Sequence, residues 1–169
     1  VTLTKTDITG QETVPGALIE VMDATGAVIY RAYTDTQGQI PEIPIVPGTY
    51  TFREVMAPDG YLLNTEEMQF TVADDGSVIG NTTLRDNFNR ILLHKVDAAG
   101  NPLAVAVFAL LNGSGREVMT AVADENGLAT FERIPCGKYT LRENTAPEGF
   151  NCMADIEVEV TPDWTAPLE

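Results

Sequence analysis

The chain has 169 residues, and 25 Asp and Glu against 10 Lys and Arg give it a formal net charge of -15. Such an acidic chain repels nucleic acid and anionic membrane surfaces, and its charge favours a soluble monomer. The hydrophobic content of 44% is enough for packed cores. No apolar run approaches the roughly 20 residues of a membrane span. We therefore expect a folded segment that neither binds nucleic acid nor inserts into a membrane.

One block of sequence occurs twice. YTFREVMAPDGY at residues 50–61 matches YTLRENTAPEGF at residues 139–150, with seven of twelve positions identical. Flanking segments echo each other in the same order at an offset near 89 residues. Repetition at a fixed offset predicts tandem copies of one structural unit. We expect one domain over residues 1–88 and a second over residues 89–169, with a short polar joint near 87–90.

Both copies carry the alternation that is typical of strands. Short runs alternate apolar and polar residues, and Gly, Pro, Asp and Asn interrupt them every ~8–12 residues. In chain order, the clearest runs are residues 1–7, 14–21, 50–54, 68–72 and 82–86, then 91–97, 102–110, 139–143 and 156–160. This pattern predicts an all-β, antiparallel sandwich or barrel with about seven strands in the first copy.

Three strands of the first copy place an ionisable side chain on their apolar face. Successive side chains of a strand point to opposite sides, so Lys5, Glu54 and Asp86 each share the face of the apolar residue two positions earlier. The chain holds only three lysines, and two of them, Lys5 and Lys95, occupy the same position of the repeat. The third, Lys138, is predicted to point outward. An isolated buried charge is costly, so these inward groups are expected to pair, neutralise or react.

Two simpler interpretations of these charges remain open at this point. The strand ends could leave the core at these residues, so that each charge would be solvated or loosely paired. Alternatively, Lys5, Glu54 and Asp86 could form a buried ion cluster that is held by hydrogen bonds alone.

The motifs around these residues resemble a known family. A first strand LxKxD, an interior YxxxE followed by APxGY, and a closing strand ending in xLxD are similar to the CnaB-type domain, also called SpaA-like or prealbumin-like, of Gram-positive surface proteins and pilins. The resemblance covers residues 1–88 and about 90–160. It implies two tandem Ig-like or prealbumin-like β-sandwiches, and an autocatalytic isopeptide bond in which Lys5 is the nucleophile. Glu54 would shuttle the proton, and Asp86 would be the acceptor, with Asn87 as the second choice because its parity is outward.

The second copy departs from this pattern. Lys95 and Glu143 match the lysine and the assisting acid. The position matching Asp86 falls beyond Glu169, however, so the second domain is expected to lack its last strand and its acceptor. Asp163 lies at the wrong place in the repeat. We therefore expect Lys95 and Glu143 to form an unproductive ion pair.

The resemblance implies a structural role. The segment would be a stalk or spacer of an extracellular, cell-wall-anchored adhesin or pilin-like protein, and its partners would be neighbouring domains of the same protein. Isopeptide formation would occur once per molecule, so no enzymatic turnover is expected. A second hypothesis is a ligand-binding adhesin module that recognises a host matrix protein or glycan. An enzyme is a third, but no Ser/His/Asp set supports it.

The other residues that stand out in the sequence are expected to have ordinary structural roles. His94 is predicted at the surface or at a domain boundary, and Trp164 is predicted to cover the core or an open edge. Cys136 and Cys152 fall at different ends of a predicted hairpin, which favours two thiols over a disulfide. The turn at residues 74–76 is a weak match to a calcium loop. No cofactor and no metal site are expected.

Overall fold

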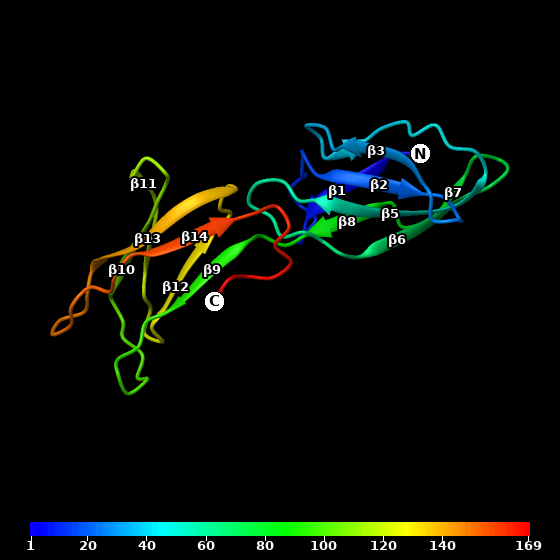
Figure 1. Ribbon diagram of the computed structural model, residues 1–169. Coiled ribbons are helices and arrows are strands. Elements are labelled where there is room, and N and C mark those ends of the chain that lie inside the picture. The colour runs from blue at the N-terminus through cyan, green and yellow to red at the C-terminus, as the bar shows by residue number, and fades with distance from the viewer. The chain divides into compact units, whose positions relative to one another are not determined.

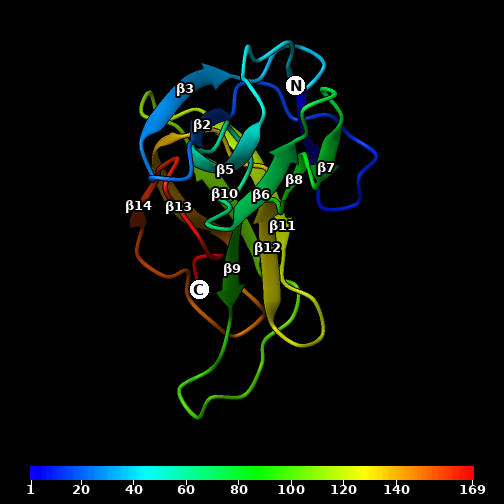
Figure 2. The same cartoon turned by 90° about the vertical axis from the view of Figure 1, so that its right-hand side faces the viewer.

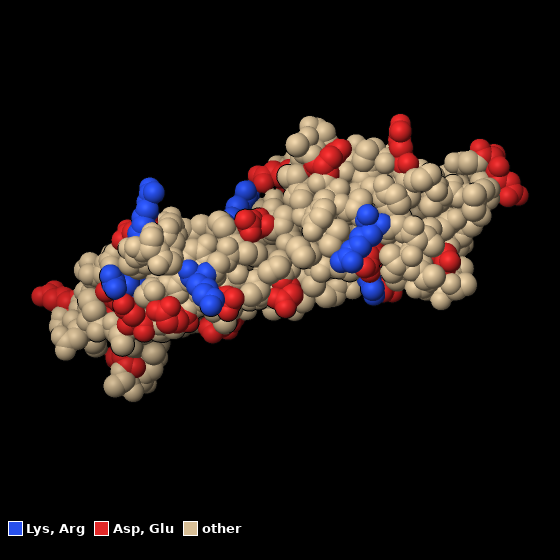
Figure 3. Space-filling model, turned by 45° about the horizontal axis from the view of Figure 1, so that its top comes forward, with Lys and Arg blue, Asp and Glu red and all other residues tan.

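The computed structural model describes residues 1–169 and divides the chain into two compact units, Val1–Phe88 (unit 1) and Asn89–Glu169 (unit 2). Both units consist of strands and connecting loops (Figure 1). The predicted all-β architecture is therefore confirmed. No helix in the structure has the length and apolar character required to span a bilayer. Lys and Arg side chains are interspersed with carboxylates on the face drawn in Figure 3.

Unit 1 contains two facing sheets. Its strands are β1 (Leu3–Asp7), β2 (Leu18–Met22), β3 (Val28–Tyr33), β4 (Gln39–Ile40), β5 (Gly48–Met56), β6 (Glu67–Val72), β7 (Val78–Gly80) and β8 (Thr83–Asp86). One sheet has the order β4-β1-β8 and the other β3-β2-β5-β6-β7. The core lies between them, because apolar side chains of both sheets form one buried cluster that includes Leu3, Leu84, Val21, Phe52 and Phe70.

The first and last strands of unit 1 run in the same direction. β1 pairs with β8 in a parallel register, with Lys5 level with Leu84 and Asp7 level with Asp86. The sandwich is therefore antiparallel, as the sequence predicts, except at this one pair. A parallel pair cannot be joined by a tight turn, and here nearly the whole domain forms the connection between the two strands.

Unit 2 repeats this arrangement with fewer strands. They are β9 (Arg90–His94), β10 (Val107–Leu111), β11 (Glu117–Val122), β12 (Leu128–Glu132), β13 (Gly137–Thr145) and β14 (Ile156–Val160). β12 pairs with β9, as Figure 2 shows, and the other sheet has the order β11-β10-β13-β14. Where unit 1 has β8, unit 2 has a single parallel bridge between Ile91 and Leu168.

A glycine turn in each unit lies against the backbone of the first-strand lysine. Gly38 has a φ of 67°, and its carbonyl accepts a hydrogen bond from the Lys5 N–H at 2.7 Å. A Cβ at Gly38 would lie 2.5 Å from the Lys5 carbonyl oxygen. Gly127 makes the same contacts with Lys95, with a φ of 75° and a Cβ position 2.4 Å from the Lys95 oxygen. These turns fix the lysine strand in place, and a side chain there has no room.

We predict that Gly38→Ala destabilises unit 1 far more than Gly76→Ala. Both glycines have positive φ, but no atom lies within 4 Å of a Cβ at Gly76. Gly76→Ala should lose only the left-handed preference, about 1 kcal/mol, whereas Gly38→Ala adds a clash with backbone that costs about 1–3 kcal/mol more. Chemical denaturation measures both, and equal losses would contradict the steric argument.

Candidate functional site

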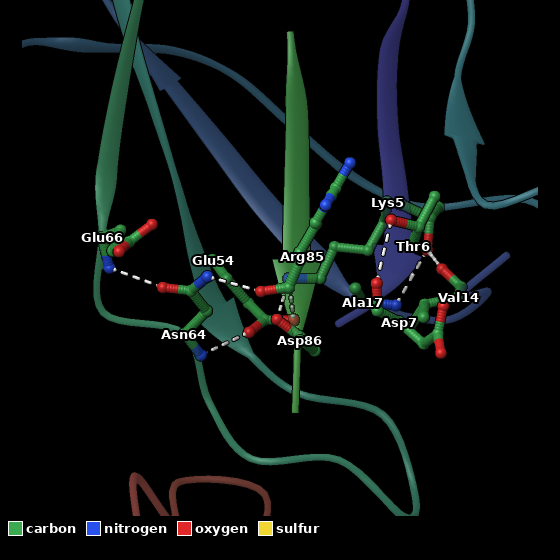
Figure 4. Close-up of polar contacts among 11 residues, drawn as sticks. Lys5, Thr6, Asp7, Val14, Ala17, Glu54, Asn64, Glu66, Arg85 and Asp86 are labelled. Carbon is green, nitrogen blue, oxygen red and sulfur yellow. Dashed lines mark hydrogen bonds and ion pairs between the residues drawn. The ribbon is translucent and has the colours of Figure 1, made fainter. Parts of the chain in front are cut away.

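Lys5 extends from β1 into the core of unit 1 and ends between two carboxyl groups. Its side chain is 1% exposed, and its Nζ lies 3.2 Å from Glu54 Oε1. The same Nζ donates a hydrogen bond to Asp86 Oδ1 (Figure 4). All three residues are buried. The interpretation of solvated strand ends is therefore wrong for this copy.

Each sheet contributes a different part of this group. Lys5 and Asp86 come from the neighbouring parallel strands β1 and β8, where Asp86 lies two residues beyond Leu84, the partner of Lys5. Glu54 comes from β5 in the facing sheet. The three side chains meet only when both sheets have packed, so the site is a product of the complete domain fold.

The Glu54 carboxyl is held by the loop that follows β5. Its Oε2 accepts a hydrogen bond from the main-chain N–H of Asn64 at 2.8 Å. The Asn64 side chain in turn donates to the carbonyl of Arg85, the residue before Asp86, at 2.7 Å. Asn64 thus connects Glu54 to β8, the strand that carries Asp86. The sequence did not indicate this role of Asn64, because any residue can donate a hydrogen bond from its main-chain N–H.

Burial dominates the electrostatics of Asp86. Removal from water raises the pKa of Asp86 to about 8; nearby Lys5 opposes the rise and the Glu54 carboxyl adds to it. Asp86 Oδ2 and Glu54 Oε1 are both buried oxygens that accept no hydrogen bond, although Glu54 Oε1 is ion-paired with Lys5. A carboxyl group in this environment holds its proton near neutral pH. Asp86 is therefore held as a neutral carboxylic acid, a form that reacts with amines more readily than a carboxylate does.

The matching pair in unit 2 lies in contact but is less enclosed. Lys95 Nζ is 3.3 Å from Glu143 Oε2, and the Lys95 side chain is 14% exposed. Glu143 Oε2 also accepts a hydrogen bond from the Met153 N–H at 2.6 Å, which repeats the contact between Glu54 and Asn64. The expected ion pair is present, and no carboxyl corresponding to Asp86 joins it among the residues of this chain.

Other candidate residues lie away from these groups. Asn87 is exposed, and its side chain accepts a hydrogen bond from the N–H of the next residue. Asp163 is exposed and bonded by Thr161. His94 and Lys138 are exposed, and Trp164 packs at the edge of the unit 2 core.

Cys136 and Cys152 are exposed and no disulfide joins them. Asp75 caps its own turn by accepting from the Ser77 N–H.

The fold and this buried group define the class of protein. Two tandem all-β sandwiches, each with a first-strand lysine against an interior glutamate, correspond to a prealbumin-like surface module. The chain belongs to the SpaA prealbumin-like fold domain family, whose sequence profile matches residues 1–86 and 89–168.

Individual relatives are longer than this chain. It is 29% identical over 76 residues to the trypsin-resistant surface T6 protein of Streptococcus pyogenes serotype M6, a match that spans 44% of this chain and 14% of that protein. The solved Bacillus anthracis TIE protein is 29% identical, with a TM-score of 0.58 over 99% of this chain and 32% of its own. The shaft pilin spaA from Lactobacillus rhamnosus GG is 16% identical, with a TM-score of 0.41 over 98% of this chain and 94% of its own.

The raised pKa of Asp86 predicts a pH-dependent stability in a variant that cannot react. In Lys5→Met, the unfolded chain releases the Asp86 proton near its ordinary pKa of 3.8, whereas the folded chain retains it to about pH 8 or above. Deprotonation therefore favours unfolding, so the stabilisation contributed by protonated Asp86 should be complete below about pH 4 and should be lost as pH rises towards 8.

Denaturant unfolding at several pH values in this range measures how the free energy of unfolding changes with pH. The matched control is Lys5→Met/Asp86→Ala, which lacks the titrating group but keeps the other carboxylates. A slope that is equal in the two variants would show that Asp86 keeps an ordinary pKa in the fold.

Proposed function

We propose that Lys5 and Asp86 form an intramolecular isopeptide bond with the assistance of Glu54. The observation that carries the proposal is the buried contact of Lys5 Nζ with both carboxyl groups. Burial raises the pKa of Asp86 and so favours its neutral acid, which is the form that can condense with an amine. The fold holds the reacting atoms together, so proximity replaces an external catalyst.

The step proceeds by addition and elimination. Lys5 Nζ attacks the side-chain carbonyl carbon of Asp86 and a C–N bond forms. Glu54 takes a proton from the nitrogen and passes it to the departing hydroxyl, so that the C–O bond breaks and one water leaves. A single proton shared by Glu54 Oε1 and Asp86 Oδ2 would satisfy both oxygens that lack a donor before the reaction. Glu54 ends the step as it began, but the lysine and the acceptor are consumed, so this is single-turnover maturation.

The bond would strengthen the module against force and unfolding. It joins the first and last strands, which lie side by side, and closes a loop of roughly 82 residues. The loop-entropy relation used for disulfides gives a stabilisation of about 4.5 kcal/mol for that length. Tension between the ends of the unit would load a covalent bond in place of sheet hydrogen bonds, and reductants would not break it.

These properties support a stalk or spacer role in an extracellular, cell-wall-anchored surface protein. The family match supports it, as does the similarity to the surface T6 protein. The chain matches only 14% and 32% of the lengths of the two relatives at 29% identity. The partners of this segment would be its neighbouring domains.

Intact-mass measurement tests the bond. We expect the wild-type chain to weigh one water less than its sequence, and Lys5→Ala or Glu54→Gln to regain that water. Asp86→Asn should still react, but should lose ammonia in place of water. Lys138→Ala, which changes an exposed lysine, should keep the loss. A wild-type mass equal to the sequence mass would refute the Lys5–Asp86 bond.

The free energy of unfolding tests whether the proposed bond stabilises unit 1. Glu54→Gln keeps the shape of the side chain but removes the proton shuttle, so its unit 1 should remain unlinked. We expect its free energy of unfolding in urea to be about 4.5 kcal/mol below that of wild type, with or without a reductant. Lys138→Ala is the control for an unrelated lysine. An unlinked variant as stable as the wild type would show that the bond carries no stability.

A further inference from the structure

The loop between β5 and β6 lies along the outer edge of β8. β8 is the last strand of its sheet, so one of its edges has no strand partner. Tyr61 of the loop forms an antiparallel bridge with Phe88, and the Leu62 N–H donates a hydrogen bond to the Asn87 carbonyl at 2.9 Å. These contacts give the loop the register of a short antiparallel strand beside the end of β8.

Asn64 departs from this pairing at one bond. Hydrogen-bonded pairs alternate along an antiparallel ladder, so the pair after Leu62 and Asn87 is Asn64 and Arg85. The Arg85 carbonyl is bonded at 2.7 Å, but by Nδ2 of the Asn64 side chain. The main-chain N–H of Asn64 donates instead to Glu54 Oε2 at 2.8 Å (Figure 4). The side-chain amide therefore replaces the main-chain donor that the ladder would have used.

The oxygen of the same amide is also fixed. Asn64 Oδ1 accepts a hydrogen bond from the Glu66 N–H at 2.8 Å, which leaves Nδ2 directed at β8. One residue thus bonds Glu54 of one sheet and the residue before Asp86 in the other. A displacement of ~1 Å can slow a reaction ~100-fold, so this connection bears on the rate of condensation.

Unit 2 separates the two contacts of Asn64. Met153 occupies the matching position, and its N–H donates to Glu143 Oε2 at 2.6 Å. Its side chain has no amide and packs against the unit 2 core. Holding the glutamate therefore needs only the main chain, and the amide of Asn64 serves the contact with β8.

We propose that Asn64 is a positioning residue for isopeptide formation in unit 1. Its amide bonds β8, which frees its main-chain N–H to hold Glu54 beside Asp86. Asn64 acts through Glu54 and β8 and is not itself a reacting group. The inference rests on the bond proposed above, but it concerns the rate at which that bond forms.

The rate of water loss during refolding tests this role. The full chain is isolated in denaturant before it has folded and is then diluted into buffer, and intact mass follows the loss of one water with time. We expect Asn64→Ala to slow the loss by ~10–100-fold. Asn81→Ala is the matched control, because Asn81 Oδ1 accepts from the Thr83 N–H at 2.9 Å and so bonds β8 at its first residue, away from Asp86. This control should react at the wild-type rate.

Stability is measured separately in the Lys5→Met background, which cannot form the bond. Both asparagine substitutions remove one side-chain hydrogen bond to β8, so we expect them to shift the urea midpoint by similar amounts. A purely structural role of Asn64 would then predict similar rates, because both folded chains would hold the reacting groups alike.

Asn64→Asp gives the positioning role a pH signature. A protonated carboxyl can donate its O–H to the Arg85 carbonyl, whereas an ionised one repels that oxygen and adds a negative charge beside Glu54. Asp titrates near pH ~4 in model peptides. The rate relative to wild type should be close to one at low pH and should fall at least ~10-fold as the substituted carboxyl ionises. Lys5, Glu54 and Asp86 are present in both chains, so the ratio removes their own titration.

The outcomes distinguish this inference from the proposed function. Water loss at the same rate in wild type and Asn64→Ala, or equal slowing by Asn81→Ala, would overturn the inference and leave the Lys5–Asp86 bond standing. A rate ratio for Asn64→Asp that does not change with pH would also contradict it, even if Asn64→Ala failed to fold. A wild-type chain that never loses water would refute the bond and the positioning role together.

Discussion

The structure of unit 1 depends on one ammonium group placed between two carboxyls inside an apolar core. A single buried charge of this kind is strongly destabilising, and even a well-made buried ion pair often contributes little net stability. Lys5 is nevertheless enclosed to 1% exposure, and one oxygen of each acid accepts no hydrogen bond. Such an arrangement is poor as a permanent salt bridge. It would make physical sense as the state before the proposed condensation, because that reaction would replace the buried amine and one carboxyl group by a neutral amide.

The second unit provides an internal comparison for this argument. It has the same lysine, the same glutamate and the same main-chain hydrogen bond to that glutamate, but its lysine is more exposed. The difference follows from the strand that encloses the site, since β8 lies beside β1 in unit 1 and contributes the buried Asp86. The same strand that encloses Lys5 would therefore also supply the proposed acceptor, whereas the pair in unit 2 is partly solvated.

Period-two alternation was sufficient to place Lys5, Glu54 and Asp86 inside the fold and to turn Asn87 outward, because burial of one strand face leaves little freedom of register. The internal repeat then identified Lys95 and Glu143. The parallel pairing of β1 with β8 was not predicted, since alternation defines the face of a strand but neither its neighbour nor its direction. The role of Asn64 was also inaccessible, because its N–H to Glu54 belongs to the backbone and the matching residue in unit 2 is a methionine.

Lys5, Glu54 and Asp86 come together only when unit 1 has folded, so the proposed reaction would depend on the completed fold. Lys5 and Asp86 are 81 residues apart in the chain, so the entropy of closing that loop must be overcome before their strands can pair. Glu54 reaches them only from the opposite sheet. The proposed amide could therefore form only in molecules whose two sheets have already packed, which would protect the lysine from reaction with incorrect carboxyls during folding. Once formed, the bond would prevent the first and last strands from separating when the two ends of the unit are pulled. The same contact order that makes this pairing slow to form would thus make the crosslink effective after it has formed.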